Sequence, residues 1–89
     1  MKIKQGFIIE KVAESYLAIA VGDLAADFKS LIKLNETSAF LWKKLEEEDL
    51  SLEELADRMV SAYGIDRSLA IKDAEKFVRV LESNGILDL

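Results

Sequence analysis

The chain contains no cysteine, no histidine and no proline. Without cysteine there is no disulfide framework, and without cysteine or histidine the usual protein ligands of zinc, iron and copper are missing. A histidine-based catalytic triad is excluded as well. Carboxylates alone can perform acid–base chemistry, but the acidic residues fall at helix starts or in the run of residues 46–49, and no pair stands out. We therefore expect a protein that is not an enzyme, needs no metal or cofactor, and acts through its surfaces.

The chain also lacks any apolar run of 18 residues, so the sequence predicts no membrane-spanning helix. The first ten residues, MKIKQGFIIE, contain neither a long apolar stretch nor a small-residue cleavage site, and we expect no signal peptide. A cytoplasmic location fits these features and the absence of cysteine. With 89 residues, the chain should form a single domain spanning residues 1–89.

Basic residues are outnumbered: 12 lysines and arginines stand against 17 aspartates and glutamates, which gives a net charge of −5. A domain that binds duplex DNA usually carries a basic excess that replaces the counterions of the phosphates. The composition therefore disfavours nucleic acid as a partner.

The first third of the chain is strand-like. Three segments are rich in β-branched and aromatic residues, and the first two are separated by Glu14 and Ser15, which predicts a hairpin. The segments are residues 7–13, 16–21 and 28–34. In a meander of these strands the third lies at an edge. Its alternation places Phe28, Ser30, Ile32 and Leu34 on one face and Lys29, Leu31 and Lys33 on the other.

The remainder is helical, and the first predicted helix begins after Asn35. An asparagine at this position can accept a hydrogen bond from an unpaired amide of the first turn, and Glu36 complements the helix dipole. The apolar stripe of this helix consists of Leu41, Trp42 and Leu45, with Phe40 near its margin. We expect Trp42, the only tryptophan, to be buried near Ile86 and Leu87.

Two further helices follow, joined by a short turn. Ser51 and Glu54 match the capping box, and Gly64 is placed to end the second helix. The apolar residues at helical spacing are Leu52, Leu55, Ala56, Met59, Val60 and Tyr63. Asp66 or Ser68 should cap the third helix, with Asn84 and Gly85 at its end. Its predicted core face is Ala70, Ile71, Ala74, Phe77, Val78 and Leu81.

Two predicted surfaces carry more apolar residues than we expect on a face that only contacts solvent. On the third strand, Leu31 lies between Lys29 and Lys33 on the face away from the core. Lysines on an edge strand can simply deter aggregation, but that does not explain the exposed leucine. A second stripe of the third helix carries Leu69 and Val80. Such a strand and helix suggest a groove for an extended peptide with apolar anchors and acidic flanks, added as another strand.

Three segments of the sequence, LNETSAFLW, SLEELADRMVSAYGID and DAEKFVRVLESNGIL, together resemble the PqqD family, named after pyrroloquinoline quinone biosynthesis. The resemblance implies an α+β, winged-helix-like fold in which a three-stranded antiparallel sheet precedes three helices. It also implies a non-catalytic peptide chaperone of ribosomally made, post-translationally modified peptides. Family members bind the leader segment of a precursor peptide and present it to a modifying enzyme, often a radical S-adenosylmethionine (SAM) protein. Stand-alone recognition proteins of lasso-peptide and other radical-enzyme pathways look similar.

In the family, the leader pairs with the third strand and lies against the third helix. Carried onto this chain, the resemblance agrees with the groove inferred above. The predicted peptide-binding residues are Lys29, Ser30, Leu31, Ile32 and Lys33 of the strand, and Leu69, Lys72, Asp73, Lys76, Arg79 and Val80 of the helix. The segment LNETSAFLW is interpreted as a structural hinge that fixes the binding strand.

Other functions remain open at this point. The short turn between the last two helices suggests a winged-helix DNA-binding transcriptional regulator, although acidic residues dilute the basic charge of the third helix. A structural subunit without a peptide ligand is a third alternative. The edge strand could also support a homodimer.

Overall fold

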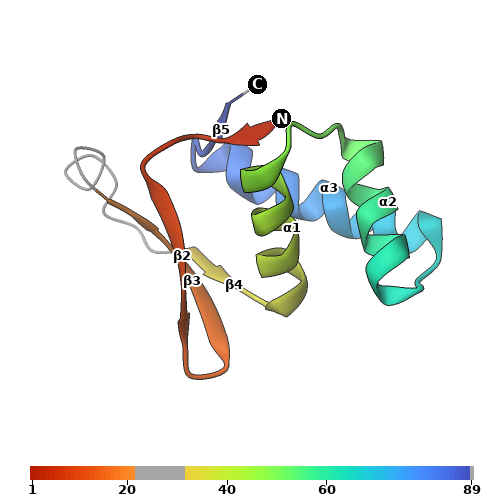
Figure 1. Cartoon of the computed structure of the whole chain (residues 1–89), viewed down its shortest axis with the longest axis horizontal. Coiled ribbons are helices and arrows are strands. Elements are labelled where there is room, and N and C mark those ends of the chain that lie inside the picture. Colours follow the sequence, from red (N-terminus) through yellow and green to blue (C-terminus); the bar gives the residue numbers. More distant parts are fainter. Residues whose placement is uncertain (22–31, 89) are drawn as a thin grey trace.

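The computed structural model describes residues 1–21 and 32–88 (Figure 1). Its order is β1 (Lys2–Ile3), β2 (Phe7–Val12), β3 (Ser15–Ala20), β4 (Ile32–Leu34), α1 (Glu36–Glu47), α2 (Leu52–Tyr63), α3 (Arg67–Ser83) and β5 (Leu87–Asp88). Strands β2, β3 and β4 form an antiparallel sheet in that order, and the three helices follow. The predicted α+β, winged-helix-like fold is confirmed. Residues 28–31 of the predicted third strand lie outside the described residues.

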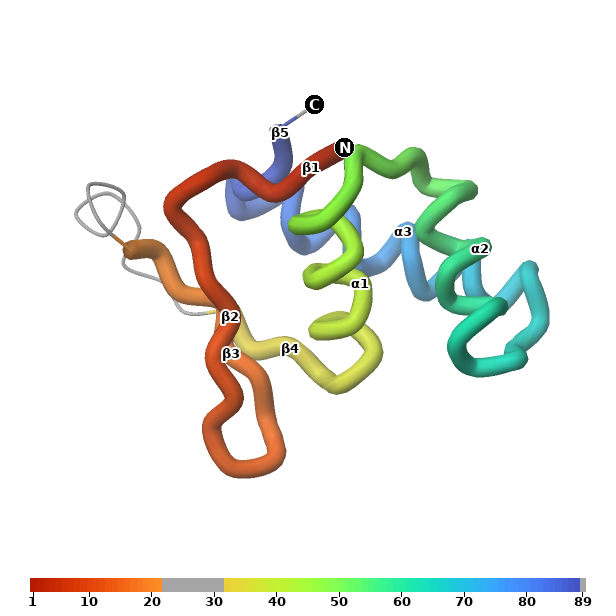
Figure 2. Tube along the Cα trace, viewed as in Figure 1, coloured from red at the N-terminus to blue at the C-terminus, as the bar shows by residue number. Residues whose placement is uncertain are grey.

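The sequence did not predict the second, two-stranded sheet. Strands β1 and β5 come from opposite ends of the chain, yet they lie side by side in Figure 2 and pair Lys2 with Asp88 and Ile3 with Leu87. Each strand has only two residues, so neither leaves a local periodic signal. Their pairing depends on contacts between residues more than 80 positions apart and was not visible in any short window.

The hairpin turn between β2 and β3 is one residue earlier than predicted. Val12 pairs with Ser15, so the turn consists of Ala13 and Glu14, and Ser15 already belongs to β3. Ala13 has a φ of 56°, in the left-handed region that a two-residue hairpin loop needs and that glycine normally supplies. The sequence placed Ala13 in the strand because alanine gives no turn signal.

The predicted N-terminal caps of α1 and α2 are present, whereas the predicted side-chain cap of α3 is not formed. The Asn35 side chain accepts a hydrogen bond from the Ser38 amide at 2.8 Å. Ser51 and Glu54 form the complete capping box of α2, and Gly64 ends that helix in the left-handed conformation. Asp66 occupies the N-cap position of α3 but makes no side-chain capping bond there.

Helix α3 ends at Asn84 and Gly85, as predicted, and its end forms a Schellman motif. The amide of Ile86 donates to the Leu81 carbonyl at 3.0 Å, and the amide of Gly85 donates to the Glu82 carbonyl at 3.1 Å. The left-handed backbone of Gly85, with φ of 67°, makes this turn possible. The motif directs Ile86 and Leu87 back onto the core, where both are buried.

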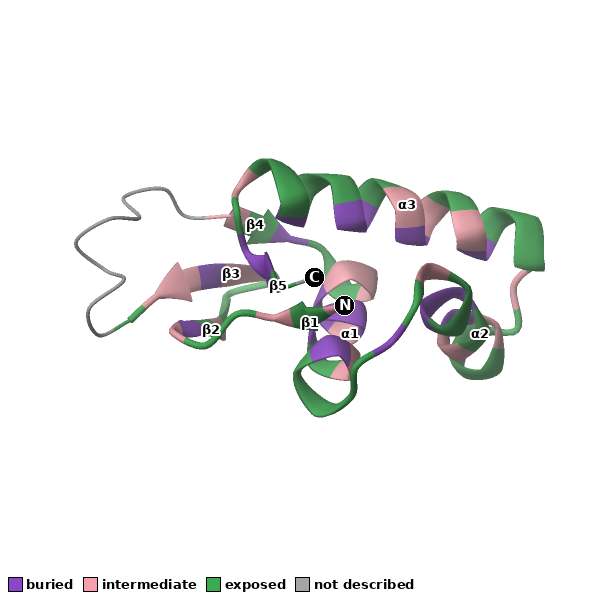
Figure 3. Cartoon of the chain, turned by 90° about the horizontal axis from the view of Figure 1, so that it is seen from above, coloured by how far each residue is buried: buried purple, intermediate pink, exposed green. Residues whose placement is uncertain are grey.

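Helix α1 lies at the centre of the fold and contacts both sheets and both other helices. Leu41, Trp42 and Leu45 are buried, as expected, in one core cluster with Ile86 and Leu87. The indole of Trp42 meets the ring of Phe7 edge-on, with the centroids 6.5 Å apart. Figure 3 shows the buried residues of α3 on the side that faces the rest of the domain.

Four residues of the predicted apolar stripes are less buried than expected. The side chain of Tyr63 is 44% exposed, because the last turn of α2 extends past the core and its ring packs against Phe40 instead. The other three are half-buried at the margin of the core: Leu52, Val60 and Ile71. Leu69 and Val80 are exposed, as the sequence indicated.

Candidate functional site

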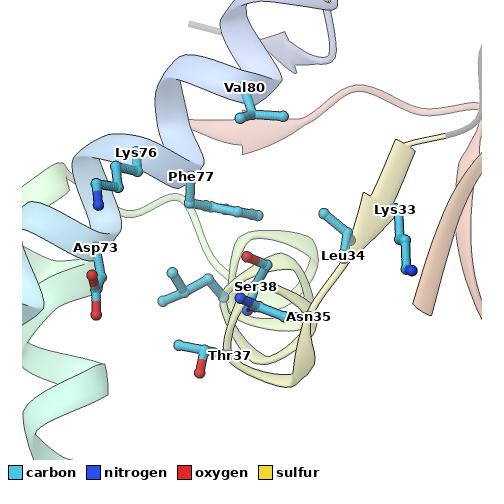
Figure 4. A pocket seen from close by; sticks show the side chains of 10 residues that line it. Lys33, Leu34, Asn35, Thr37, Ser38, Asp73, Lys76, Phe77 and Val80 are labelled. Atoms are coloured by element: carbon cyan, nitrogen blue, oxygen red, sulfur yellow. Dashed lines mark hydrogen bonds between the residues drawn. The ribbon is translucent and has the colours of Figure 1, made fainter. Parts of the chain in front are cut away.

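A groove of about 310 Å³ lies between β4, the beginning of α1 and one side of α3 (Figure 4). It combines apolar side chains with polar groups at one end. Its lining residues are Lys33, Leu34, Asn35, Thr37, Ser38, Leu41, Asp73, Lys76, Phe77 and Val80.

Helix α3 supplies one wall of this groove. Asp73, Lys76, Phe77 and Val80 are spaced three and four residues apart, so their side chains project from one face of the helix. Phe77 is almost completely buried and forms the base of the wall, whereas Val80 is 44% exposed. In Figure 4 the Phe77 ring points toward β4 and the start of α1.

Strand β4 supplies the opposite wall, and among the described strands it pairs only with β3. The register fixes the direction of its backbone groups. The Val21 amide donates to the Gly6 carbonyl at 2.7 Å, which makes Gly6 and Val21 a hydrogen-bonded pair of the β2–β3 ladder. Hydrogen-bonded and non-hydrogen-bonded pairs alternate along antiparallel strands. Every second pair from Gly6–Val21 onward is hydrogen-bonded, and this includes the pair Glu10–Leu17. The backbone amide and carbonyl of Leu17 therefore point toward β2.

The same alternation extends to β4. Because Leu17 directs its backbone groups to β2, its pairing with Lys33 is the non-hydrogen-bonded kind. The amide and carbonyl of Lys33 consequently point away from β3, toward the open edge. Ile32 and Leu34 instead direct their backbone groups to Ala18 and Tyr16. Strand β4 thus offers an outward donor and acceptor at Lys33 for a further strand.

The structure brings together four of the eleven predicted binding residues in this groove: Lys33, Asp73, Lys76 and Val80. Leu69 belongs to the same helical face, but it and Lys72 do not line the groove. Lys29, Ser30 and Leu31 lie outside the described residues.

Two other predicted residues face elsewhere. Ile32 is half-buried and packs against the core. Arg79 lies on another face of α3, beside Met1 and Leu52, and pairs with Glu75 at 3.9 Å. Neither residue lines the groove between β4 and α3.

Sequence reasoning missed six lining residues: Leu34, Asn35, Thr37, Ser38, Leu41 and Phe77. Five of them belong to LNETSAFLW, which was interpreted as a hinge. Capping and core packing already explained these residue types, so the sequence held no separate signal for a surface. The segment positions the strand and also forms the floor of the groove.

Two of the cations on α3 form ion pairs with acidic side chains. Arg67 pairs with Asp57 of α2, and Arg79 pairs with Glu75 on its own helix. Within residues 1–21 and 32–88, no group of three acidic side chains is arranged to hold a metal ion. In the same residues, no helix has the length and apolarity needed to cross a membrane.

Comparison with known proteins agrees with this fold. The sequence model of the family described as coenzyme PQQ synthesis protein D (PqqD) matches residues 23–87. The chain belongs to the PqqD family. No curated protein matches the chain significantly.

Two solved structures share the fold. The structure of TbiB1 in complex with the TbiA(beta) leader peptide superposes with a TM-score of 0.73 at 22% identity, covering 99% of this chain and 95% of that one. A lasso peptide synthetase B1 complexed with its leader peptide gives a TM-score of 0.72 at 19% identity, covering 96% and 93%.

Proposed function

We propose that this protein is a non-catalytic chaperone for a ribosomally made precursor peptide. It binds the leader segment as an additional strand along β4 and presents the precursor to a modifying enzyme such as a radical SAM protein. We propose that it acts in the cytoplasm, where ribosomes synthesise precursor peptides.

The observation that carries the proposal is the open edge of β4 beside the groove. Strand addition requires outward backbone groups for affinity and neighbouring pockets for side chains that alternate along the peptide. The outward amide and carbonyl of Lys33 meet the first requirement, and the groove against α3 meets the second. Membership of the PqqD family and the leader-bound structures of similar fold support this interpretation.

The chemistry of the groove indicates which leader residues it accepts. Leu34, Leu41, Phe77 and Val80 provide an apolar surface for one aliphatic or aromatic anchor. Lys76 provides a cation at the same face and favours an acidic neighbour of that anchor. Asp73, one helical turn away, disfavours an acidic group beyond it.

DNA binding receives less support. The arginines Arg67 and Arg79 of α3 are already paired with carboxylates, and the whole chain carries a net charge of −5. A DNA-binding helix needs cations that are available to the phosphates.

Proline at position 33 tests strand addition, because it removes the outward amide while leaving the β3–β4 ladder in place. We expect Lys33→Pro to fold and to bind the leader segment of its precursor peptide at least about tenfold more weakly than Lys33→Ala does. Lys33→Ala is the matched control, because it removes the same charge and keeps the amide. Isothermal titration measures both affinities.

Ile32→Pro provides the converse control. The Ile32 amide points to β3, so this variant should lose sheet structure by circular dichroism. Equal leader affinity of Lys33→Pro and Lys33→Ala would refute strand addition at β4. Duplex DNA binding at low salt, lost steeply as salt rises, would favour the regulator instead.

A further inference from the structure

The outer face of the three-stranded sheet is apolar and has no partner within the described residues. Side chains alternate across a strand, and Phe7, Ile9 and Ala18 face the core. The intervening residues point the other way. They are Ile8, Glu10 and Val12 of β2, Ser15, Leu17 and Ile19 of β3, and Lys33 of β4.

The apolar side chains of this outer face are neighbours, unlike the isolated apolar residues that are common on protein surfaces. Ile8 is 41% and Val12 is 51% exposed, and Leu17 and Ile19 between them are half-buried without packing against the core cluster. Leu17 and Ile19 sit next to each other on β3, with Ile8 directly opposite Ile19. Monomeric proteins seldom expose a contiguous apolar patch of this kind unless it binds something.

Opposite charges lie at the two edges of this face. Leu17 pairs with Glu10 on one side and with Lys33 on the other, so one row across the sheet reads acidic, apolar, basic. Among the described residues, neither Glu10 nor Lys33 forms an ion pair. The side chains of Lys33 and Leu34 extend from opposite sides of β4, which leaves the Lys33 ammonium on the outer face (Figure 4).

From this pattern we infer that a second copy of the chain covers the outer face, forming a sheet-to-sheet dimer with its twofold axis along β3. Rotation about that axis brings Glu10 of one copy opposite Lys33 of the other, twice, while Leu17 meets Leu17 at the centre. Packed sheets lie about 10 Å apart, a gap that a glutamate and a lysine together can span. Such an isologous interface is the commonest form of oligomer symmetry.

The dimer is compatible with the groove but does not depend on it. Lys33 is shared by the two sites, with its backbone groups at the open edge and its side chain on the outer face, whereas the other groove residues lie toward α3. Both copies therefore keep an open strand edge. The inference therefore stands or fails independently of the proposed leader binding.

Sedimentation equilibrium over a concentration series tests the dimer. We expect the unmodified chain to dimerise reversibly and Leu17→Glu to weaken association by at least about 100-fold, because two carboxylates would meet at the apolar centre. Circular dichroism and an unchanged leader affinity would show that Leu17→Glu still folds. A chain that stays monomeric throughout the series overturns the inference, including the case in which a modifying enzyme covers this face instead.

Charge exchange tests the symmetry of the interface. Glu10→Lys or Lys33→Glu alone should each weaken the dimer about tenfold, since every substitution acts at two equivalent contacts. The double variant should regain most of the lost affinity. Glu82→Lys, at an exposed position of α3 away from the three-stranded sheet, serves as the matched charge-reversal control and should change nothing. Failure of the double variant to recover would overturn the proposed axis.

Discussion

Replacing Trp42 by alanine would test how much of this small domain depends on its central helix. The indole is completely buried and contacts Phe7, within a cluster that joins the sheet, α1 and α3. Truncating a buried tryptophan to alanine costs about 3–5 kcal/mol. A domain of 89 residues has a total stability of about 4–13 kcal/mol. Trp42→Ala should therefore lose a large part of the free energy of unfolding and is expected to be partly unfolded at 37 °C.

A second variant, Trp42→Phe, tests whether the unpaired indole Nε1–H lowers the stability. Phenylalanine leaves about 40 Å³ unfilled, which costs roughly 1 kcal/mol. The indole Nε1–H is buried without a hydrogen-bond partner among the described residues, and such a donor carries a desolvation penalty of about 1–3 kcal/mol. The phenylalanine variant removes that penalty. We expect its stability to lie within about 1 kcal/mol of the unmodified protein.

Urea unfolding followed by far-ultraviolet circular dichroism measures both variants, since neither retains a tryptophan for fluorescence. A loss below about 1 kcal/mol for Trp42→Ala would contradict the central role of the indole. A loss for Trp42→Phe as large as that for alanine would instead show that the Nε1–H is satisfied, for example by an ordered water.

The remaining predictions concern local structure. Ala13→Gly should raise stability by about 1 kcal/mol in urea unfolding, because Ala13 occupies the left-handed region; no gain would mean that its strain is negligible. Ser51→Ala should lose about 1 kcal/mol with an unchanged denaturant slope, because it removes the capping box; Ser61→Ala, on the exposed side of the same helix, is the control. The Met1 amino group, through a hydrogen bond and its charge, lowers the pKa of Asp49. Asp49→Asn should therefore lower the melting temperature at pH 7, and the difference should disappear as pH falls through the lowered pKa; a difference that persists at pH 2 would exclude this pair as its source.

Only some of the predicted binding residues line the groove, and the reason is geometric. Asp73, Lys76 and Val80 share a helical face with the lining residue Phe77, so helical periodicity places them together. Arg79 was expected next to this stripe, but it lies beside Met1 on another face of the helix. Helical spacing does not determine which neighbouring segment a residue at the margin of a stripe contacts.

The local sequence was sufficient for most of the secondary structure. Asn35, Ser51 and Gly64 mark helix ends through hydrogen bonds or backbone conformations within four residues, so a short window contains the whole signal. Apolar spacing also identified the buried faces of all three helices, because burial on a helix follows its period.

Only the tertiary structure decided the features that depend on distant pairs. The β1–β5 sheet joins the two ends of the chain, and the outward direction of the Lys33 amide follows from a register that begins at Gly6 and Val21. The left-handed Ala13 shifts the hairpin turn, which a strand propensity cannot anticipate. The groove exists because α1 holds β4 opposite α3. Local sequence determines where helices and strands form, whereas edges, registers and grooves arise from packing between segments far apart in the chain.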